Sequence, residues 1–323
     1  MLIEWPPMRS MDLDPTFVPY LRSVVAGRTV PIQHDDIVER RARMIALRRE
    51  SAPPPPSDVS ISNQAIEADD HEIPVRIYHP GTLALRPGIV YFHGGGWMFG
   101  SAEQSDAIAI RYCRAADAVV VSPDYRLSPE HPFPAGFEDC RSALMWTFQS
   151  SSLLAIDADR IAVAGESSGA NLAAACAIDV RDSGAPPLAL QVLVYPALGL
   201  DFDTTSYVEN AAAPVLSRDE MTFFWEAYLA ANSETRDPRA APLMAPDLSG
   251  LAPAWIASAE YDPLREDGAR YARRLAEAGV PVDYRNAERL THGFMRAWSV
   301  SDDVQAIGAA IIAALRGAFG EAD

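Results

Sequence analysis

Hydrophobic residues recur with two different periods along this chain. Four apolar residues between positions 17 and 24 stand at i, i+3, i+4 and i+7, and a second set predicts another helix over 37–45. The prolines at 53–56 then end the helical pattern, because proline cannot continue a helix and favours an extended spacer. We therefore expect a helical N-terminal segment, residues 1–52, that forms a unit of its own.

Beyond residue 57, short β-rich runs alternate with helical segments, a pattern typical of βαβ units. Several runs are apolar almost throughout, as expected for a mostly parallel sheet with helices on both faces. This rhythm stops over residues 200–239, where Ser217 and Glu220 have the spacing of a capping box. We therefore expect an α/β core in two parts, 57–199 and 240–323, with an inserted cap segment between them. The predicted strands are 73–78, 88–92, 118–123, 160–164, 190–195, 254–257 and 282–284.

Composition and charge narrow the class of protein. With 323 residues, 49% of them hydrophobic, the chain can bury a large core. Its formal net charge of -17 repels phosphate backbones and anionic membranes, which disfavours a nucleic-acid partner. The apolar stretches are too short for a stable membrane insertion, and the start of the chain lacks the pattern of a signal peptide. The three cysteines fit neither a disulfide framework nor a zinc site. We expect a cytoplasmic protein.

A serine nucleophile is predicted where an apolar strand runs into the sequence Gly165-Glu-Ser167-Ser-Gly169 and then into an alanine-rich helix. In this G-x-S-x-G context, small flanking residues allow a sharp turn that presents the serine hydroxyl above the sheet. The N-terminal end of the helix favours a developing oxyanion. An ordinary serine in a tight turn is the alternative interpretation. Ser168 is a competing hydroxyl, but Ser167 alone holds the central position.

The base and the acid follow from chain order. Such a serine is followed along the chain first by its acid and then by its histidine, and of the six histidines only His292 lies beyond Ser167. The acid should lie on a loop after a strand, where it can orient the imidazole. Asp262, on the turn after the strand at 254–257, meets this requirement, with Glu260 in reserve.

A glycine run after the strand at 88–92 supplies candidate oxyanion donors. Without side chains, Gly94, Gly95 and Gly96 let backbone N–H groups approach a ligand closely. A phosphate cradle is the alternative, but the chain has neither the G-x-x-x-x-G-K-[ST] motif nor the G-x-G-x-x-G spacing. An HGGG sequence combined with a later G-x-S-x-G indicates acyl transfer, with the N–H of Ser168 as a further donor.

Together these motifs resemble the hormone-sensitive-lipase-like family of α/β-hydrolase esterases, the bacterial family IV carboxylesterases. The resemblance implies an α/β-hydrolase fold, a mostly parallel central sheet flanked by helices, with a helical cap formed by residues 1–52 and 200–239. It also implies a triad of Ser167, Asp262 and His292 and no metal or cofactor. The motifs that carry it are HGGGW at 93–97, SPDYRLSPEHPFPAG at 122–136, GESSGAN at 165–171, VYP at 194–196, DPLRED at 262–267 and HGF at 292–294.

The expected substrates are short- to medium-chain acyl esters, hydrolysed through an acyl-enzyme. A departure from the family pattern, G-E-S-S-G-A in place of G-D-S-A-G-G, leaves the chain-length preference open. Two alternatives remain: another carbonyl substrate such as an aryl formamide, lactone or carbamate, and a non-catalytic receptor for a small ligand. Edge strands could pair across a two-fold axis in a homodimer. We expect the acyl pocket to be lined by Trp97, Phe224, Trp225 and Phe294.

Overall fold

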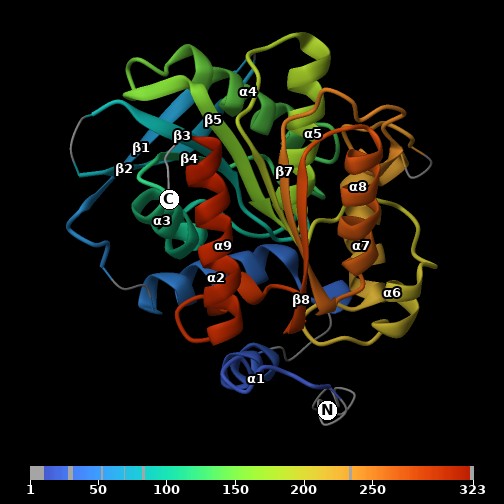
Figure 1. The fold of residues 1–323 in the computed structure, drawn as a ribbon. Helices are drawn as coiled ribbons and strands as arrows, with labels where there is room; N and C mark the ends of the chain where they lie inside the picture. The colour runs from blue at the N-terminus through green and yellow to red at the C-terminus, as the bar shows by residue number, and fades with distance from the viewer. Residues whose placement is uncertain are drawn as a thin grey trace.

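An eight-stranded sheet forms the centre of the structure (Figure 1). The computed structural model describes residues 11–27, 32–51, 54–68, 70–81, 84–232 and 235–320, so the first ten residues and Pro53 lie outside the described residues. In the sheet the strands follow the order β1-β2-β4-β3-β5-β6-β7-β8. Strands β3 to β8 are parallel, and β2 pairs antiparallel with both β1 and β4. The predicted α/β class with a mostly parallel sheet is therefore confirmed.

All seven predicted strands are present, and one further strand escaped the prediction. The first edge strand, β1, has most of its side chains exposed, so its sequence lacks both an apolar run and a regular alternation. The strands are β1 (Val59–Glu67), β2 (Glu72–Pro80), β3 (Arg86–Phe92), β4 (Val119–Pro123), β5 (Ile156–Glu166), β6 (Gln191–Val194), β7 (Ala254–Tyr261) and β8 (Val282–Thr291).

Helices cover both faces of the sheet and create two hydrophobic cores (Figure 1). Helices α4, α5 and α8 pack on one face with buried residues such as Leu144, Ala173 and Leu275. Helices α3 and α9 pack on the other, where Tyr112 and Ile311 are buried. The helices are α1 (Val18–Ala26), α2 (Ile37–Ser51), α3 (Asp106–Ala115), α4 (Ala135–Gln149), α5 (Ser168–Ser183), α6 (Thr205–Glu209), α7 (Arg218–Leu229), α8 (Arg265–Glu277) and α9 (Asp302–Ala318).

The N-terminal helices and the 200–239 segment add helices outside the two layers. In Figure 1, α1 and α2 lie at the lower end of the view, below the sheet. Helix α7 begins at the predicted capping box, in which Ser217 and Glu220 each accept a hydrogen bond from the other's backbone N–H. Helix α2 is fastened by Arg41, which donates to the carbonyl oxygens of Met98 and Ser128, both at 2.7 Å. Arg41 also forms an ion pair with Glu130 at 2.7 Å.

One glycine of α9 is required by a close helix contact. The indole ring of Trp298 lies against Gly308, and a Cβ atom there would overlap the ring. We expect Gly308→Ala to lower the free energy of unfolding by about 1–3 kcal/mol, because the core would be overpacked. Gly317, in the same helix, has no neighbouring atom within 4 Å of an added Cβ. Gly317→Ala should therefore leave the protein as stable or slightly more stable. Urea unfolding of both variants tests this, and equal stabilities would contradict the packing argument.

Candidate active site

Ser167 occupies a strained turn between β5 and α5. Its backbone has a φ of 56° and a ψ of -121°, a region that residues with side chains rarely adopt. The turn is held by the N–H of Ser167, which donates to the carbonyl of Val194 on β6 at 2.9 Å. It also requires a glycine at 169, since a Cβ there would overlap the Phe92 carbonyl at the end of β3. The strand, the turn and the helix therefore present the Ser167 side chain at the carboxyl end of the sheet.

Ser167, His292 and Asp262 form a continuous hydrogen-bonded chain. His292 Nε2 lies 3.0 Å from Ser167 Oγ, and His292 Nδ1 lies 2.7 Å from Asp262 Oδ2. The other carboxylate oxygen of Asp262 accepts the N–H of Leu264 at 2.9 Å, and Asp262 is completely buried. These contacts fit a neutral imidazole that donates from Nδ1 and accepts the serine hydroxyl at Nε2. The three residues predicted from chain order are therefore neighbours in the fold.

The reserve acid has another place in the structure. Glu260 accepts the backbone N–H of Arg289 at 2.7 Å, so its carboxylate ties the ends of β7 and β8 together.

Two other histidines, His93 and His131, form no hydrogen bond with Ser167 among the described residues. His93 is buried and stacks on Tyr125, with ring centroids 4.3 Å apart, and burial lowers its pKa. His131 is exposed, and its backbone is held by hydrogen bonds to Leu127 and Ser128.

The glycine run lies directly beside the serine. A Cβ atom on Gly94 would lie 3.4 Å from the Cβ of Ser167, and all three glycines of the run line the same cavity as Ser167. Within the described part of the chain, the N–H groups of Gly95, Gly96 and Ser168 have no hydrogen-bond acceptor. The hydroxyl of Ser168 is buried and has no partner among the described residues. Free backbone donors therefore meet next to the Ser167 hydroxyl.

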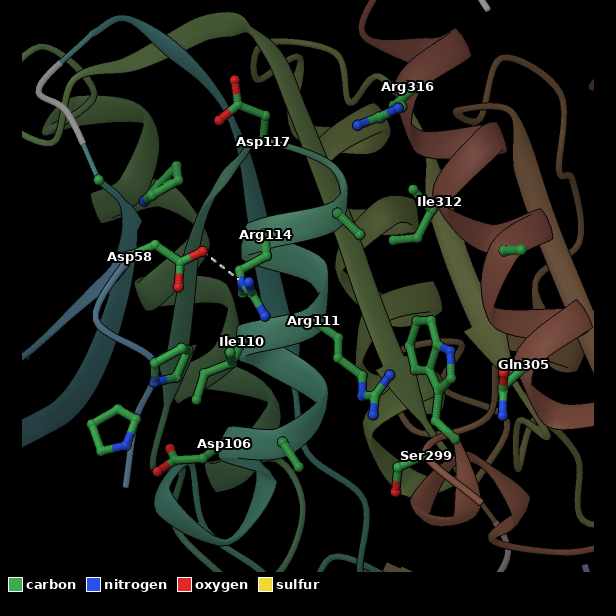
Figure 2. A pocket seen from close by; sticks show the side chains of 18 of the residues that line it. Asp58, Asp106, Ile110, Arg111, Arg114, Asp117, Ser299, Gln305, Ile312 and Arg316 are labelled. Atoms are coloured by element: carbon green, nitrogen blue, oxygen red, sulfur yellow. Dashed lines mark hydrogen bonds and ion pairs between the residues drawn. The ribbon is translucent and has the colours of Figure 1, made fainter. Parts of the chain in front are cut away.

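Two hollows stand out on the surface, and only one contains the serine. The larger, about 1310 Å³, is a groove between α3 and α9 that Figure 2 shows from close by. Its charged groups include an ion pair between Arg114 and Asp58 at 2.8 Å and Arg111 stacked on Trp298. The smaller, about 390 Å³, is lined by Ser167, His292 and the glycine run. The hydrogen-bonded chain therefore faces the smaller cavity.

The lining of this cavity differs in part from the prediction. Phe224 of α7 lines it, whereas Trp97, Trp225 and Phe294 are not among its lining residues. Trp97 stacks on Tyr228 of α7 with ring centroids 4.3 Å apart, and Trp225 of α7 packs against the Trp97 indole. Both tryptophans therefore hold α7 against the core. Phe294 packs edge-on against Tyr195. The walls come instead from the N-terminal helices, the loop after β3, helix α7 with the residues before it, and the segment after β8. They include Tyr20, Ile32, Met44, Phe99, Leu216, Met221 and Arg296.

A second buried carboxyl group, that of Asp267, lies near the loop that carries Asp262. It lies in the first turn of α8 and accepts the N–H groups of Leu198 and Gly199 at 2.8 and 3.0 Å. The segment after β6 is thereby held against the loop that carries Asp262. Burial raises the pKa of Asp267 to about 7, although the two backbone hydrogen bonds act in the opposite direction.

The described residues were also searched for metal sites and membrane spans. No group of three or more His, Cys, Asp and Glu side chains among them is placed to hold a metal ion. None of the helices in the described ranges has both the length and the apolar character that crossing a bilayer requires.

Comparison with known proteins shows similarity over nearly the whole chain. A family model described as the alpha/beta hydrolase fold matches residues 89–296. Carboxylesterase NlhH of Mycobacterium tuberculosis is 39% identical over 295 residues, which cover 90% of this chain and 91% of that protein. Esterase LipI of the same organism is 40% identical over 290 residues, 88% of this chain and 89% of that protein. The crystal structure of esterase LipW from Mycobacterium marinum superposes with a TM-score of 0.86 at 34% identity, covering 95% and 96% of the two chains.

The buried position of Asp267 predicts a pH dependence of stability. Its pKa of about 7 lies above the usual value of about 3.9 in an unfolded chain, so the folded protein binds more protons between these two values. Stability from this group is therefore lost as the pH rises towards 7, with a slope of at most about 1.4 kcal/mol per pH unit. We expect wild type to lose stability relative to Asp267→Asn between pH 5 and 7, as measured by urea unfolding. A difference that does not change with pH would contradict the assignment.

Proposed function

Because the chain belongs to the hormone-sensitive-lipase-like branch, bacterial family IV, of the α/β-hydrolase-fold family, we propose that it is a carboxylesterase with Ser167 as nucleophile. The observation that carries this proposal is the hydrogen-bonded chain from Ser167 through His292 to Asp262, at the wall of a cavity that the glycine run also lines. Its relatives named as esterases support the reaction class.

Each side chain has a distinct part in the proposed mechanism. His292 Nε2 removes the proton of the Ser167 hydroxyl as the serine oxygen attacks the ester carbonyl. The buried carboxylate of Asp262 holds the imidazole through Nδ1 and stabilises the imidazolium that forms. His292 then protonates the leaving alcohol. Water, deprotonated by the same imidazole, hydrolyses the acyl-enzyme and regenerates the serine.

The oxyanion is stabilised by backbone donors in this proposal. Gly95 and Gly96 line the cavity, Ser168 directly follows the serine, and the N–H groups of all three lack an acceptor among the described residues. These donors are fixed before substrate binds, because the turn and the glycine run are held by neighbouring strands. Donors already in place need no rearrangement when charge develops in the transition state.

The cavity favours small esters. Its volume of about 390 Å³ lies at the lower end of the range for small-molecule sites, about 300–1,000 Å³. Its apolar walls come from both the N-terminal helices and the inserted segment, as Met44 and Met221 illustrate. We propose that residues 1–52 and 200–239 form the cap of the pocket on the α/β core, and that the preferred acyl groups are short to medium in length. The cytoplasmic location and the homodimer remain predictions of the sequence.

Removal of the nucleophile is the direct test of the reaction. We expect Ser167→Ala to lose at least a thousandfold in kcat on p-nitrophenyl butyrate, because no other group can form the acyl-enzyme. Ser168→Ala is the matched control, since it removes the neighbouring hydroxyl but keeps the backbone N–H. It should retain turnover within about tenfold. Full activity in Ser167→Ala would exclude Ser167 as the nucleophile.

Acyl-chain length tests the size of the pocket. With p-nitrophenyl esters of two to sixteen carbons, kcat/KM should reach its maximum at eight carbons or fewer and then fall, since longer chains exceed the cavity. Initial rates below the critical micelle concentration of each ester provide the measurement. A maximum on the longest chains would show that the cavity opens well beyond its present volume.

A further inference from the structure

The catalytic cavity has one cationic wall with unused hydrogen-bond donors. Arg296 follows β8 in a short 3-10 helix (Phe294–Ala297), and its side chain lines the cavity while remaining exposed. Within the described ranges, no carboxylate lies within ion-pairing distance of its guanidinium and no acceptor takes a hydrogen bond from it. Its five N–H donors are therefore available to a molecule in the cavity.

Tyr20 adds a second hydrogen-bond donor to the same cavity. It belongs to α1, lines the same cavity and is only half-buried. Its hydroxyl also lacks a hydrogen-bond partner among the residues that the structure describes. Burial raises the pKa of the Tyr20 phenol, and the charge of Arg296 acts to lower it. A phenol and a guanidinium thus line the same cavity.

The other charged groups of the lining are already engaged. Asp35 forms ion pairs with Arg40 and Arg43, at 3.1 and 2.8 Å. Glu166 is buried, and its carboxylate accepts a hydrogen bond from the Tyr195 hydroxyl. Besides the triad, the described lining therefore carries three arginines against two carboxylates, in a chain whose net charge is -17. With the Asp262 carboxylate behind His292 included, these charges balance, and Arg296 is the one arginine of the described lining that has no ion-pair partner.

The charge of Glu166 acts on Arg296 without forming an ion pair with it. Desolvation acts to lower the pKa of Arg296, but the charge of Glu166 and the neighbouring tyrosines together outweigh it, so the pKa of the guanidinium is raised. The two side chains are not within ion-pairing distance, and the Glu166 carboxylate has its own donor in Tyr195. Arg296 is therefore a cation, as guanidinium groups in proteins are, and Glu166 leaves its donors free.

We propose that the preferred substrates are esters that carry an ionised carboxylate, and that Arg296, assisted by the Tyr20 hydroxyl, binds this carboxylate. The inference rests on the proposed esterase function and names its substrate class. A planar guanidinium pairs with a carboxylate through two parallel N–H···O bonds, which fixes orientation as well as charge. Placed beside the nucleophile, such a pair would position the ester carbonyl for attack and select against neutral esters.

The test compares matched esters in two arms at pH 7.5. The first arm uses p-nitrophenyl monoesters of succinate, glutarate and adipate, which place the carboxylate on the acyl side at three distances. The second uses 3- and 4-acetoxybenzoate, which place it on the alcohol side. Each ester is paired with the analogue that has a carboxamide in place of the carboxylate. The readout is the ratio of kcat/KM for the anionic and neutral member of each pair.

We expect the ratio for at least one pair to fall tenfold or more in Arg296→Gln, equivalent to about 1.4 kcal/mol. Arg296→Lys should retain part of the preference, because it keeps the charge but not the planar fork. Tyr20→Phe should lower the ratio about threefold. The control is Arg111→Gln, which removes one positive charge from the remote groove of Figure 2, where Arg111 has no ion pair among the described residues. Its ratio should stay within twofold of wild type.

The outcomes separate this inference from the function on which it rests. A wild type that hydrolyses neither anionic nor neutral esters overturns both. A wild type that hydrolyses neutral esters, with ratios unchanged in Arg296→Gln and in Tyr20→Phe, overturns only the carboxylate preference. Equal losses in Arg296→Gln and Arg111→Gln would also overturn it, because the effect would then come from net charge alone. Thermal unfolding of each variant verifies that it is folded, and Tyr20→Phe tests the site if Arg296→Gln is not.

Discussion

The close approach of the β5–α5 turn to the end of β3 is the constraint on which the rest of the site depends. In the parallel pairing of these strands, Phe92 stands opposite Gly165, so the residues after each strand emerge side by side. The pairing of these strands therefore places the glycine run after β3 beside Ser167 after β5. The contact leaves no room for a side chain at position 169, and it holds Ser167 in a backbone conformation that an unsupported turn would abandon. Packing of the sheet thus stabilises the strain that exposes the serine.

Buried carboxyl groups are the second organising feature, and backbone N–H groups donate hydrogen bonds to them. Asp262 and Asp267 are both buried near the start of α8, and each accepts hydrogen bonds from backbone N–H groups of nearby loops. Such bonds compensate part of the loss of hydration and at the same time fix the loops that supply them. His292 is oriented by Asp262, so the geometry at the serine depends on how well this carboxylate is held. Hydrogen bonds to the two carboxyl groups therefore hold the loop that carries Asp262.

The core and the cavity walls are held in place by different kinds of contact. The sheet and its flanking helices place the reacting groups, and these elements resemble those of related esterases over nearly the whole chain. The walls come from α1, α2 and α7, which are attached by side-chain contacts such as those of Arg41 and the stacked pair of Trp97 and Tyr228. Side-chain attachments of this kind can vary while the sheet is preserved. In the proposed function, the core therefore sets the reaction class and the proposed cap sets the choice of substrate.

Local sequence determined the elements and the candidate reacting residues. Short β-rich runs predicted seven of the eight strands in the described chain, including the largely exposed edge strand β8. The G-x-S-x-G and HGGG motifs each depend on a few neighbouring residues that a linear pattern can contain. The expected order of serine, acid and histidine along the chain then left His292 as the one candidate base and few candidates for the acid. The exposed edge strand β1 was missed because its side chains do not need a periodic apolar pattern.

Tertiary structure alone decided which side chains face the cavity. Trp97, Trp225 and Phe294 have the size and hydrophobicity of pocket residues, yet packing against Tyr228 and Tyr195 turns them into the core. Arg296 and Tyr20 have no motif, and their presence in one cavity depends on how α1 sits against the segment after β8. Burial of a large aromatic side chain satisfies the hydrophobic effect equally well in a core or in a pocket. The direction in which it points is therefore set by the neighbours that the fold provides, which residue type and spacing do not encode.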